Sequence, residues 1–355
     1  MNRFKKHWEE GLKVELSFDK KGVDAGTTCA LSETIVNHKT QALPVLSVSI
    51  SADNSFEFTD ELKEDAQTFV SDNYYRTDTY SLKPMRRIRK DLYFKPQKRG
   101  YFKISDPKII AKDFFMLNEY SRVYEGDASI YVYPKKVRVP EAERLFLRIQ
   151  GQVQARRALE EDPFTFRSIR EYRPGDPERY INWKASARND SLLVNTHDST
   201  FSVRVGIITD ANTFSVVDRS VMQEKCISVT SSVCMMALRT GAQVGVYSNF
   251  RDFENEREVF VNPGSNRQHL GVVDRVLARV NTDLKTDSFD EYLDRFENSM
   301  ETFTEYIVIM AEYQDKAFEK INQLKNKGYG ISGLVIKSRE TGGKIYKLPE
   351  GFITI

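Results

Sequence analysis

Residues 166–188 read FRSIREYRPGDPERYINWKASAR, a stretch in which charged residues are interleaved with turn residues. Pro174-Gly175 is typical of a tight turn, because proline fixes φ and glycine accepts positive φ. Asp176 is predicted to cap the helix that follows, since its carboxylate can accept hydrogen bonds from the free N–H groups of the first turn. We therefore expect a short helix over residues 177–188 that serves as a largely buried brace.

The side chains of the same stretch make it the best candidate for a binding site. Arginine recognises carboxylates and phosphates through paired hydrogen bonds, and aromatic rings offer stacking faces. The candidate interaction residues are Arg167, Arg170, Tyr172, Arg173, Asp176, Arg179, Trp183, Lys184 and Arg188. A structural alternative stays open, in which the arginines form internal salt bridges with Glu171, Asp176 and Glu178 and clamp the helix in place.

The ordered pattern of this stretch also resembles a known family. It runs Arg170-Glu171-Tyr172-Arg173-Pro174-Gly175-Asp176, then Arg179, Ile181, Trp183, Lys184 and Ala187-Arg188. It is similar to the family catalogued as domain of unknown function 58. The resemblance implies a β-rich N-terminal region, a C-terminal von Willebrand factor A-like domain, and a MoxR-type AAA+ ATPase as partner in bacterial complex assembly or envelope processes. It carries over no enzymatic activity.

Length and composition set the class of protein. The 355 residues are enough for two domains that each bury a core. A net charge of +2 is too small for a general nucleic-acid binder, so any basic site must be local. The three cysteines form no CxxC pair, which indicates neither a disulfide framework nor a zinc site and favours a reducing, cytoplasmic setting.

The N-terminal residues bear on membrane association. No run of about 18 apolar residues is present, so no spanning helix is predicted. Arg3, Lys5, Lys6 and Trp8 resemble the flank that follows membrane helices in members of the family, or else form a frayed polar terminus. We expect a cytoplasmic protein, at the inner face of the membrane if such helices precede this chain.

Hydrophobic periodicity predicts the domain organisation. Residues 1–134 contain short alternating runs typical of an antiparallel β-sandwich, residues 135–200 are a connector with the signature helix, and residues 201–355 alternate strand and helix as in a doubly wound α/β domain. The expected strands are 12–18, 28–36, 45–50, 75–82, 86–94, 100–104, 203–209, 243–247, 306–310 and 331–336. The expected helices are 142–149, 217–240, 268–280 and 315–327.

Asp210 and Asn212 are the candidate metal ligands. They follow the first strand of the α/β region, where the resemblance implies an Asp-x-Ser-x-Ser metal motif, but Phe214 stands in place of the second serine. A hard cation wants about six oxygen ligands, so a Mg²⁺ or Mn²⁺ site here is the weaker alternative to a loop acid or helix cap. No cofactor is expected. Residues 341–344 (TGGK) lack the spacing of a phosphate loop and are predicted to form a hairpin turn.

We expect a non-enzymatic interaction protein, and the family resemblance implies that it acts as an adaptor for a MoxR-type AAA+ ATPase. Two other functions stay open. One is a metal-dependent phosphoester or nucleic-acid enzyme that uses Asp210 with Arg170, Arg173 and Arg179. The other is a module that holds a phosphate-rich ligand through the same arginines without chemistry.

Overall fold

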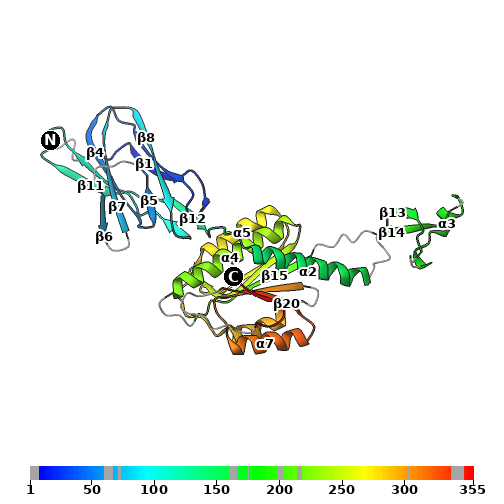
Figure 1. The fold of residues 1–355 in the computed structure, drawn as a ribbon. Helices are drawn as coiled ribbons and strands as arrows, with labels where there is room; N and C mark the ends of the chain where they lie inside the picture. The colour runs from blue at the N-terminus through cyan, green and yellow to red at the C-terminus, as the bar shows by residue number, and fades with distance from the viewer. Residues whose placement is uncertain are drawn as a thin grey trace. The chain divides into compact units, whose positions relative to one another are not determined.

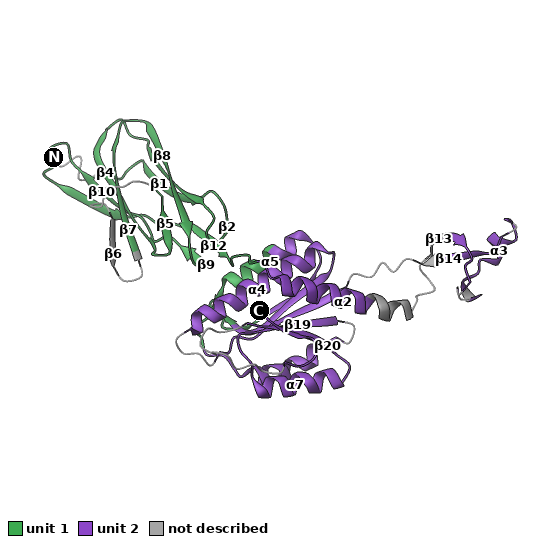
Figure 2. Ribbon diagram, viewed as in Figure 1, with its two compact units in different colours: residues 1–137, 251–259, 271–284 green, residues 138–250, 260–270, 285–355 purple. Residues whose placement is uncertain are grey.

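The chain folds into a mixture of helices and sheets (Figure 1). The computed structural model describes residues 8–59, 67–70, 73–159, 166–174, 176, 178–189, 191–197, 203–213, 218–301, 304–336 and 348–355. These divide into two compact units (Figure 2). The first unit comprises residues 1–137, 251–259 and 271–284, and the second comprises residues 138–250, 260–270 and 285–355.

The N-terminal region is built of β-strands in three sheets. The first sheet has the order β1 (Leu12–Phe18), β3 (Cys29–Asn37), β8 (Arg86–Pro96), β5 (Phe56–Phe58). The second has the order β11 (Glu119–Val123), β10 (Lys108–Lys112), β4 (Leu43–Asp53), β7 (Asn73–Leu82), β6 (Gln67–Val70). A smaller sheet joins β2 (Gly22–Asp24), β12 (Ser129–Tyr133) and β9 (Gly100–Lys103). Both larger sheets are antiparallel, as predicted.

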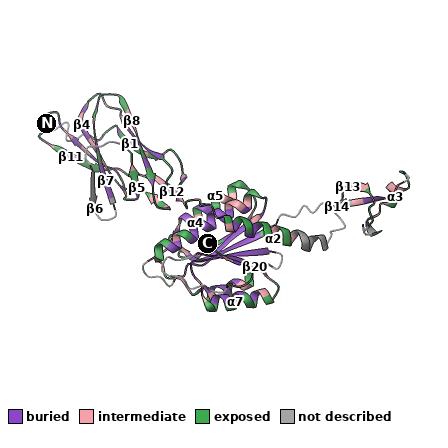
Figure 3. Cartoon of the chain, in the orientation of Figure 1, coloured by how far each residue is buried: buried purple, intermediate pink, exposed green. Residues whose placement is uncertain are grey.

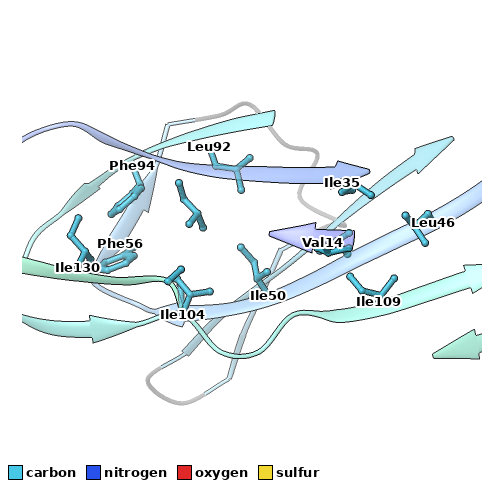
Figure 4. Packing of buried hydrophobic residues seen from close by; sticks show 14 of the residues in the cluster. Val14, Ile35, Leu46, Ile50, Phe56, Leu92, Phe94, Ile104, Ile109 and Ile130 are labelled. Carbon is cyan, nitrogen blue, oxygen red and sulfur yellow. The ribbon is translucent and has the colours of Figure 1, made fainter. Parts of the chain in front are cut away.

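One hydrophobic core joins the two larger sheets. Because side chains alternate across a strand, the apolar positions of each strand face the same side. Ile35 and Leu92 from the first sheet lie in one cluster with Leu46, Ile50 and Ile109 from the second (Figure 4). Two antiparallel sheets that bury their apolar faces against each other form a sandwich.

The second region contains a mostly parallel sheet. Its strands have the order β17 (Glu258–Gly264), β16 (Gln243–Asp252), β15 (Arg204–Thr209), β19 (Thr304–Met310), β20 (Gly330–Val335), β21 (Phe352–Thr354), and β18 (Val280–Asn281) pairs with β16. The pairs from β16 to β21 are parallel. If β15 is counted as strand 1 and β18 is left out, the order is 3-2-1-4-5-6, which is that of a doubly wound sheet.

Helices cover both faces of this sheet. They are α2 (Pro140–Leu159), α4 (Arg219–Arg239), α5 (Arg267–Ala278), α6 (Phe289–Phe296) and α7 (Asp315–Asn326). Helix α4 packs on β15 and β19, and α7 packs on β20 from the other face (Figure 1). All seven residues of β19 are buried, as a strand covered on both sides requires (Figure 3).

Most of the predicted elements are confirmed, with two differences outside the signature. The connector helix α2 spans 20 residues, more than twice the predicted length, although Gly151 lies within it. The second difference is that the sequence did not predict several short elements, namely β2, β5, β6, β10, β11, β12, β17, β18, α6 and β21. The predicted turn at residues 341–344 lies outside the described residues. Within the part of the chain that the structure describes, no helix is long and apolar enough to cross a membrane.

Candidate functional site

The signature stretch forms a hairpin with short helical turns instead of one helix. Strand β13 (Phe166–Glu171) pairs antiparallel with β14 (Leu193–His197), and between them lie a 3-10 turn (η2, Glu178–Tyr180) and helix α3 (Trp183–Ser186). We call residues 166–197 the signature hairpin. The predicted helix over residues 177–188 is therefore wrong.

The break in the expected helix lies at Ile181 and Asn182. Ile181 forms an isolated bridge with Val194, and the N–H of Asn182 donates to the carbonyl of Leu193 at 2.8 Å. These pairings draw the backbone toward β14, so helical bonds cannot run through this point. Asn182 then caps α3, because its side-chain oxygen accepts from the N–H of Ala185 at 2.9 Å.

Asp176 holds the turn together and caps no helix. Both nitrogens of the Arg170 fork donate to its carboxylate at 2.7 Å, and the N–H of Arg173 donates at 2.8 Å. Hydrogen bonds from Arg170 and then Arg173 lower the pKa of Asp176 to about 2. The structural alternative therefore holds for the pair of Arg170 and Asp176. Neither Glu171 nor Glu178 forms an ion pair with another described side chain of the hairpin.

The remaining candidate residues are mostly exposed. Trp183 is 67% exposed, and no residue of α3 is buried, so the prediction of a buried brace is wrong for this element. Exposed members of the predicted set are Arg173, Trp183, Lys184 and Arg188, whereas Tyr172 is half-buried. The side chains of Arg167 and Arg179 lie outside the described residues. The small core of the hairpin consists of Tyr180, Leu193 and Val194.

A second candidate site lies at the carboxyl end of β15. Asp210 follows this strand and is fully buried. Its Oδ1 accepts from the N–H of Asn212 at 2.9 Å and from Nδ2 of Asn249 at 3.2 Å. Its Oδ2 accepts from Nε2 of Gln314 at 2.5 Å. Burial raises the pKa of Asp210 to about 7 despite these hydrogen bonds.

Further hydrogen bonds, mostly from side-chain amides, hold the loops around Asp210 together. Nδ2 of Asn212 and Nδ2 of Asn249 both donate to the carbonyl of Asp287, at 2.9 and 3.2 Å. The Thr286 hydroxyl donates to Oδ1 of Asn212 at 3.0 Å. The residues of this network come from the loop after β15, strand β16, the loop before α6 and the loop after β19, so the closed arrangement depends on the sheet order. We call Asp210, Asn212, Asn249, Thr286, Asp287 and Gln314 the amide-closed edge.

This arrangement does not fit a hard cation. The structure brings the predicted ligands Asp210 and Asn212 together, but N–H donors occupy both oxygens of Asp210 and a hydroxyl occupies the oxygen of Asn212. A Mg²⁺ or Mn²⁺ ion needs such lone pairs for about six oxygen ligands. Among the described residues there is no group of three or more His, Cys, Asp or Glu side chains placed to hold a metal. Phe214 lies outside the described residues.

Sequence reasoning missed Asn249 and Gln314. Asn249 lies within β16 and Gln314 lies four residues after β19, so both stand near the carboxyl ends of strands that flank β15. In an open α/β sheet, side chains from those ends converge at the point where the strand order reverses. This rule could have pointed to Asn249 and Gln314. It requires the strand order, however, which a single sequence does not supply.

Comparison with known proteins finds similarity over the part of the chain that contains both candidate sites. A family model described as "Protein of unknown function DUF58" matches residues 168–325, less than half of the chain. "Uncharacterized protein YeaD" of Bacillus subtilis (strain 168) is 26% identical over 152 residues, which are 42% of this chain and 36% of that protein. The chain therefore spans about a third of the length of that relative.

Solved structures give only weak matches. A CARDB domain from Pyrococcus furiosus, crystallised with di-metal ions, covers 34% of this chain and 91% of its own, with 16% identity and a TM-score of 0.23. A non-cellulosomal cohesin from Archaeoglobus fulgidus covers 37% of this chain and 96% of its own, with 12% identity and a TM-score of 0.24. These scores carry no argument about this chain. The resemblance that the sequence predicted thus rests on the match of residues 168–325 to the DUF58 family.

Proposed function

We propose that this chain is a non-enzymatic interaction protein, an adaptor for a MoxR-type AAA+ ATPase in bacterial complex assembly or envelope processes. The observation that carries the proposal is Trp183, which is 67% exposed and stands beside the exposed cation Lys184 on a short, internally bonded hairpin. The family resemblance supports the choice of partner and a von Willebrand factor A-like identity for the α/β region. The strand order 3-2-1-4-5-6 is compatible with that identity.

The exposed tryptophan favours binding to a protein. A large aromatic side chain left in water stabilises the fold little, whereas Trp, Tyr and Arg dominate the energetically important positions of protein interfaces. Arg173 and Arg188 are exposed on the same hairpin, and among the described residues neither has an ion-pair partner. An aromatic side chain among unpaired cations fits a partner surface with an apolar pocket and acidic residues around it.

Internal bonds of the hairpin support a preorganised binding surface. Nδ2 of Asn182 donates to Oδ1 of Asn195 at 2.8 Å, and the Ser186 hydroxyl accepts from the N–H of Leu193 at 2.9 Å. Together with the fork of Arg170 on Asp176, these bonds fix the segments that carry the exposed residues. A surface that is already ordered loses less conformational entropy when a partner binds.

The amide-closed edge supports binding over catalysis. A general base or metal ligand must be reachable by the substrate or cation, whereas Asp210 is fully buried and accepts three hydrogen bonds from N–H groups. We therefore do not propose the phosphoester or nucleic-acid enzyme, and we propose no cofactor.

A pull-down with a MoxR-type AAA+ ATPase from the same genome tests the proposal. The test variant is Lys184→Glu with Arg188→Glu, which reverses charge at exposed positions of the hairpin. The matched control is Arg86→Glu with Arg87→Glu, a reversal of the same size at exposed positions of β8 in the sandwich. We expect the first variant to lose the ATPase and the control to retain it. Retention by both variants, with the folds intact, would remove the hairpin from the partner surface.

A further inference from the structure

The turn between β10 and β11 presents a continuous run of exposed apolar side chains. Phe114, Phe115, Met116 and Leu117 are 79%, 74%, 66% and 76% exposed. We call these four residues the apolar tip. In the described part of the chain, no other four consecutive residues are all large, apolar and exposed. Single exposed apolar residues are ordinary on protein surfaces, but a run of this kind indicates an interaction site.

The backbone N–H groups of Met116 and Leu117 are paired within the turn. The N–H of Met116 donates to the carbonyl of Asp113 at 3.0 Å, and the N–H of Leu117 donates to Oδ1 of Asp113 at 2.9 Å. The N–H of Asp113 donates to the carbonyl of Asn118 at 3.2 Å, and Nδ2 of Asn118 donates to Oδ2 of Asp113 at 2.7 Å. The tip therefore exposes apolar side chains while much of its hydrogen bonding is directed inward, toward Asp113.

Met116 has an exposed side chain and a backbone conformation that is unfavourable for residues other than glycine. Its φ is 57°, in the left-handed region where glycine is the preferred residue. A glycine would relieve the strain, yet the position carries a long apolar side chain directed into solvent.

We propose that the apolar tip inserts into the interfacial region of a lipid bilayer. Entry into an apolar medium favours backbone polar groups that are paired internally, and the N–H groups of Met116 and Leu117 are paired with Asp113. Phenylalanine, leucine and methionine supply the buried apolar area, and aromatic side chains favour the membrane interface.

The size of the tip favours a lipid surface over a protein partner. A stable protein interface buries about 800 Å² on each partner, more than four side chains at a turn can supply. The strands that flank the tip carry paired charges, since Lys112 pairs with Glu119 at 3.6 Å and Arg122 pairs with Glu9, and Val123 is the one large apolar residue of these two strands that is exposed. Because these flanking charges are paired, insertion depends mainly on apolar area, and anionic lipid strengthens it little.

Flotation of the full chain with phosphatidylcholine vesicles, with and without phosphatidylglycerol, tests this inference. Phe114→Ser with Phe115→Ser should lower the partition coefficient by about tenfold or more, because each serine removes most of the apolar area that a phenylalanine would bury. Met116→Gly should lower it less. Both variants should keep the circular dichroism of the wild type.

Met85→Gly is the matched control. Met85 also has a positive φ, 51°, and is 65% exposed, but it stands alone in the turn between β7 and β8. Glycine relieves the same strain and removes the same side chain, so vesicle binding should not change. The inference is overturned if wild type fails to float, or if the Phe114 and Phe115 variant floats equally well. It is also overturned if wild type self-associates without lipid and this variant does not, since a second copy would then cover the tip. None of these outcomes involves the ATPase.

Discussion

Asp176 in the signature hairpin and Asp210 in the amide-closed edge are the same residue type under opposite electrostatic conditions. An arginine fork holds Asp176 and lowers its pKa to about 2, whereas burial among neutral amides raises the pKa of Asp210 to about 7. Asp176 is ionised near pH 7 in a partly exposed turn, whereas the buried Asp210 is only partly ionised at that pH. The difference shows that a paired guanidinium favours the ionised carboxylate, whereas burial among neutral amides favours the protonated acid.

The largest expected effect is the pH dependence that Asp210 imposes on stability. Because its folded-state pKa lies above the ordinary value of 3.8, folding binds a proton between these values, so stability falls as pH rises from about 4 to about 7. Asp210→Asn should remove that fall and stabilise the protein at pH 8 by roughly 2–4 kcal/mol. The side-chain oxygen of the new asparagine can still accept from Asn249. Its NH2 group can donate to the side-chain oxygen of Gln314 if the Gln314 amide is flipped. Urea unfolding at several pH values measures this, and a flat wild-type profile would contradict it.

Gln314→Glu should open the amide-closed edge. It replaces the donor to Asp210 with a second carboxylate in the same place, which we expect to cost about 3 kcal/mol at pH 8. Millimolar Mg²⁺ or Mn²⁺ should restore part of that stability, while wild type should bind neither ion in a calorimetric titration.

Gln323→Glu is the control for this substitution. It makes the same chemical change at an exposed position of α7, so its effect should stay within about 0.5 kcal/mol. Stoichiometric, micromolar metal binding by wild type that is lost in Asp210→Ala would show that the amides do not close the edge.

Arg170→Lys should raise the pKa of Asp176 toward 3.8, because lysine keeps the charge but cannot form the paired hydrogen bonds. The bonds that Asp176 makes stabilise the hairpin above about pH 4 and are lost as pH falls toward 2 in wild type, so the variant should lose them at higher pH. Carboxyl-carbon NMR titration measures both aspartates in one experiment. Arg173→Lys is the control, since Arg173 acts on Asp176 chiefly through a backbone N–H that lysine retains.

Helices and strands with a regular hydrophobic pattern along their length could be predicted from the sequence. Structure that depends on contacts between residues far apart in the chain could not. Helix α4 has a buried apolar stripe of Met222, Cys226, Val229 and Val233, and every residue of strand β19 is buried. Because each pattern extends along a whole element, one exceptional residue does not hide it. In the signature, the predicted cap Asp176 is bonded by Arg170 and Arg173, and the pairing of Ile181 with Val194 interrupts the predicted helix. The closing of Asp210 by Asn249 and Gln314 depends on sheet order, which periodicity does not contain.

The smallest expected effect on stability comes from Trp183→Ala. Its side chain is 67% exposed, so the free energy of unfolding should change by less than about 0.5 kcal/mol. Urea unfolding checks this. A loss above about 2 kcal/mol would mean that Trp183 packs against another part of the protein and is not available to a partner.

We propose that the signature hairpin, and not the amide-closed edge, carries the partner-binding surface. This proposal is tested by the affinity of a MoxR-type AAA+ ATPase for wild type, Trp183→Ala and Asp210→Asn, measured by calorimetry at pH 8. We expect Trp183→Ala to raise the Kd by about tenfold or more, as loss of a tryptophan at the centre of an interface does, and Asp210→Asn to leave the Kd unchanged. An unchanged Kd for Trp183→Ala together with a weakened Kd for Asp210→Asn would contradict the proposal and place the binding surface at the sheet edge.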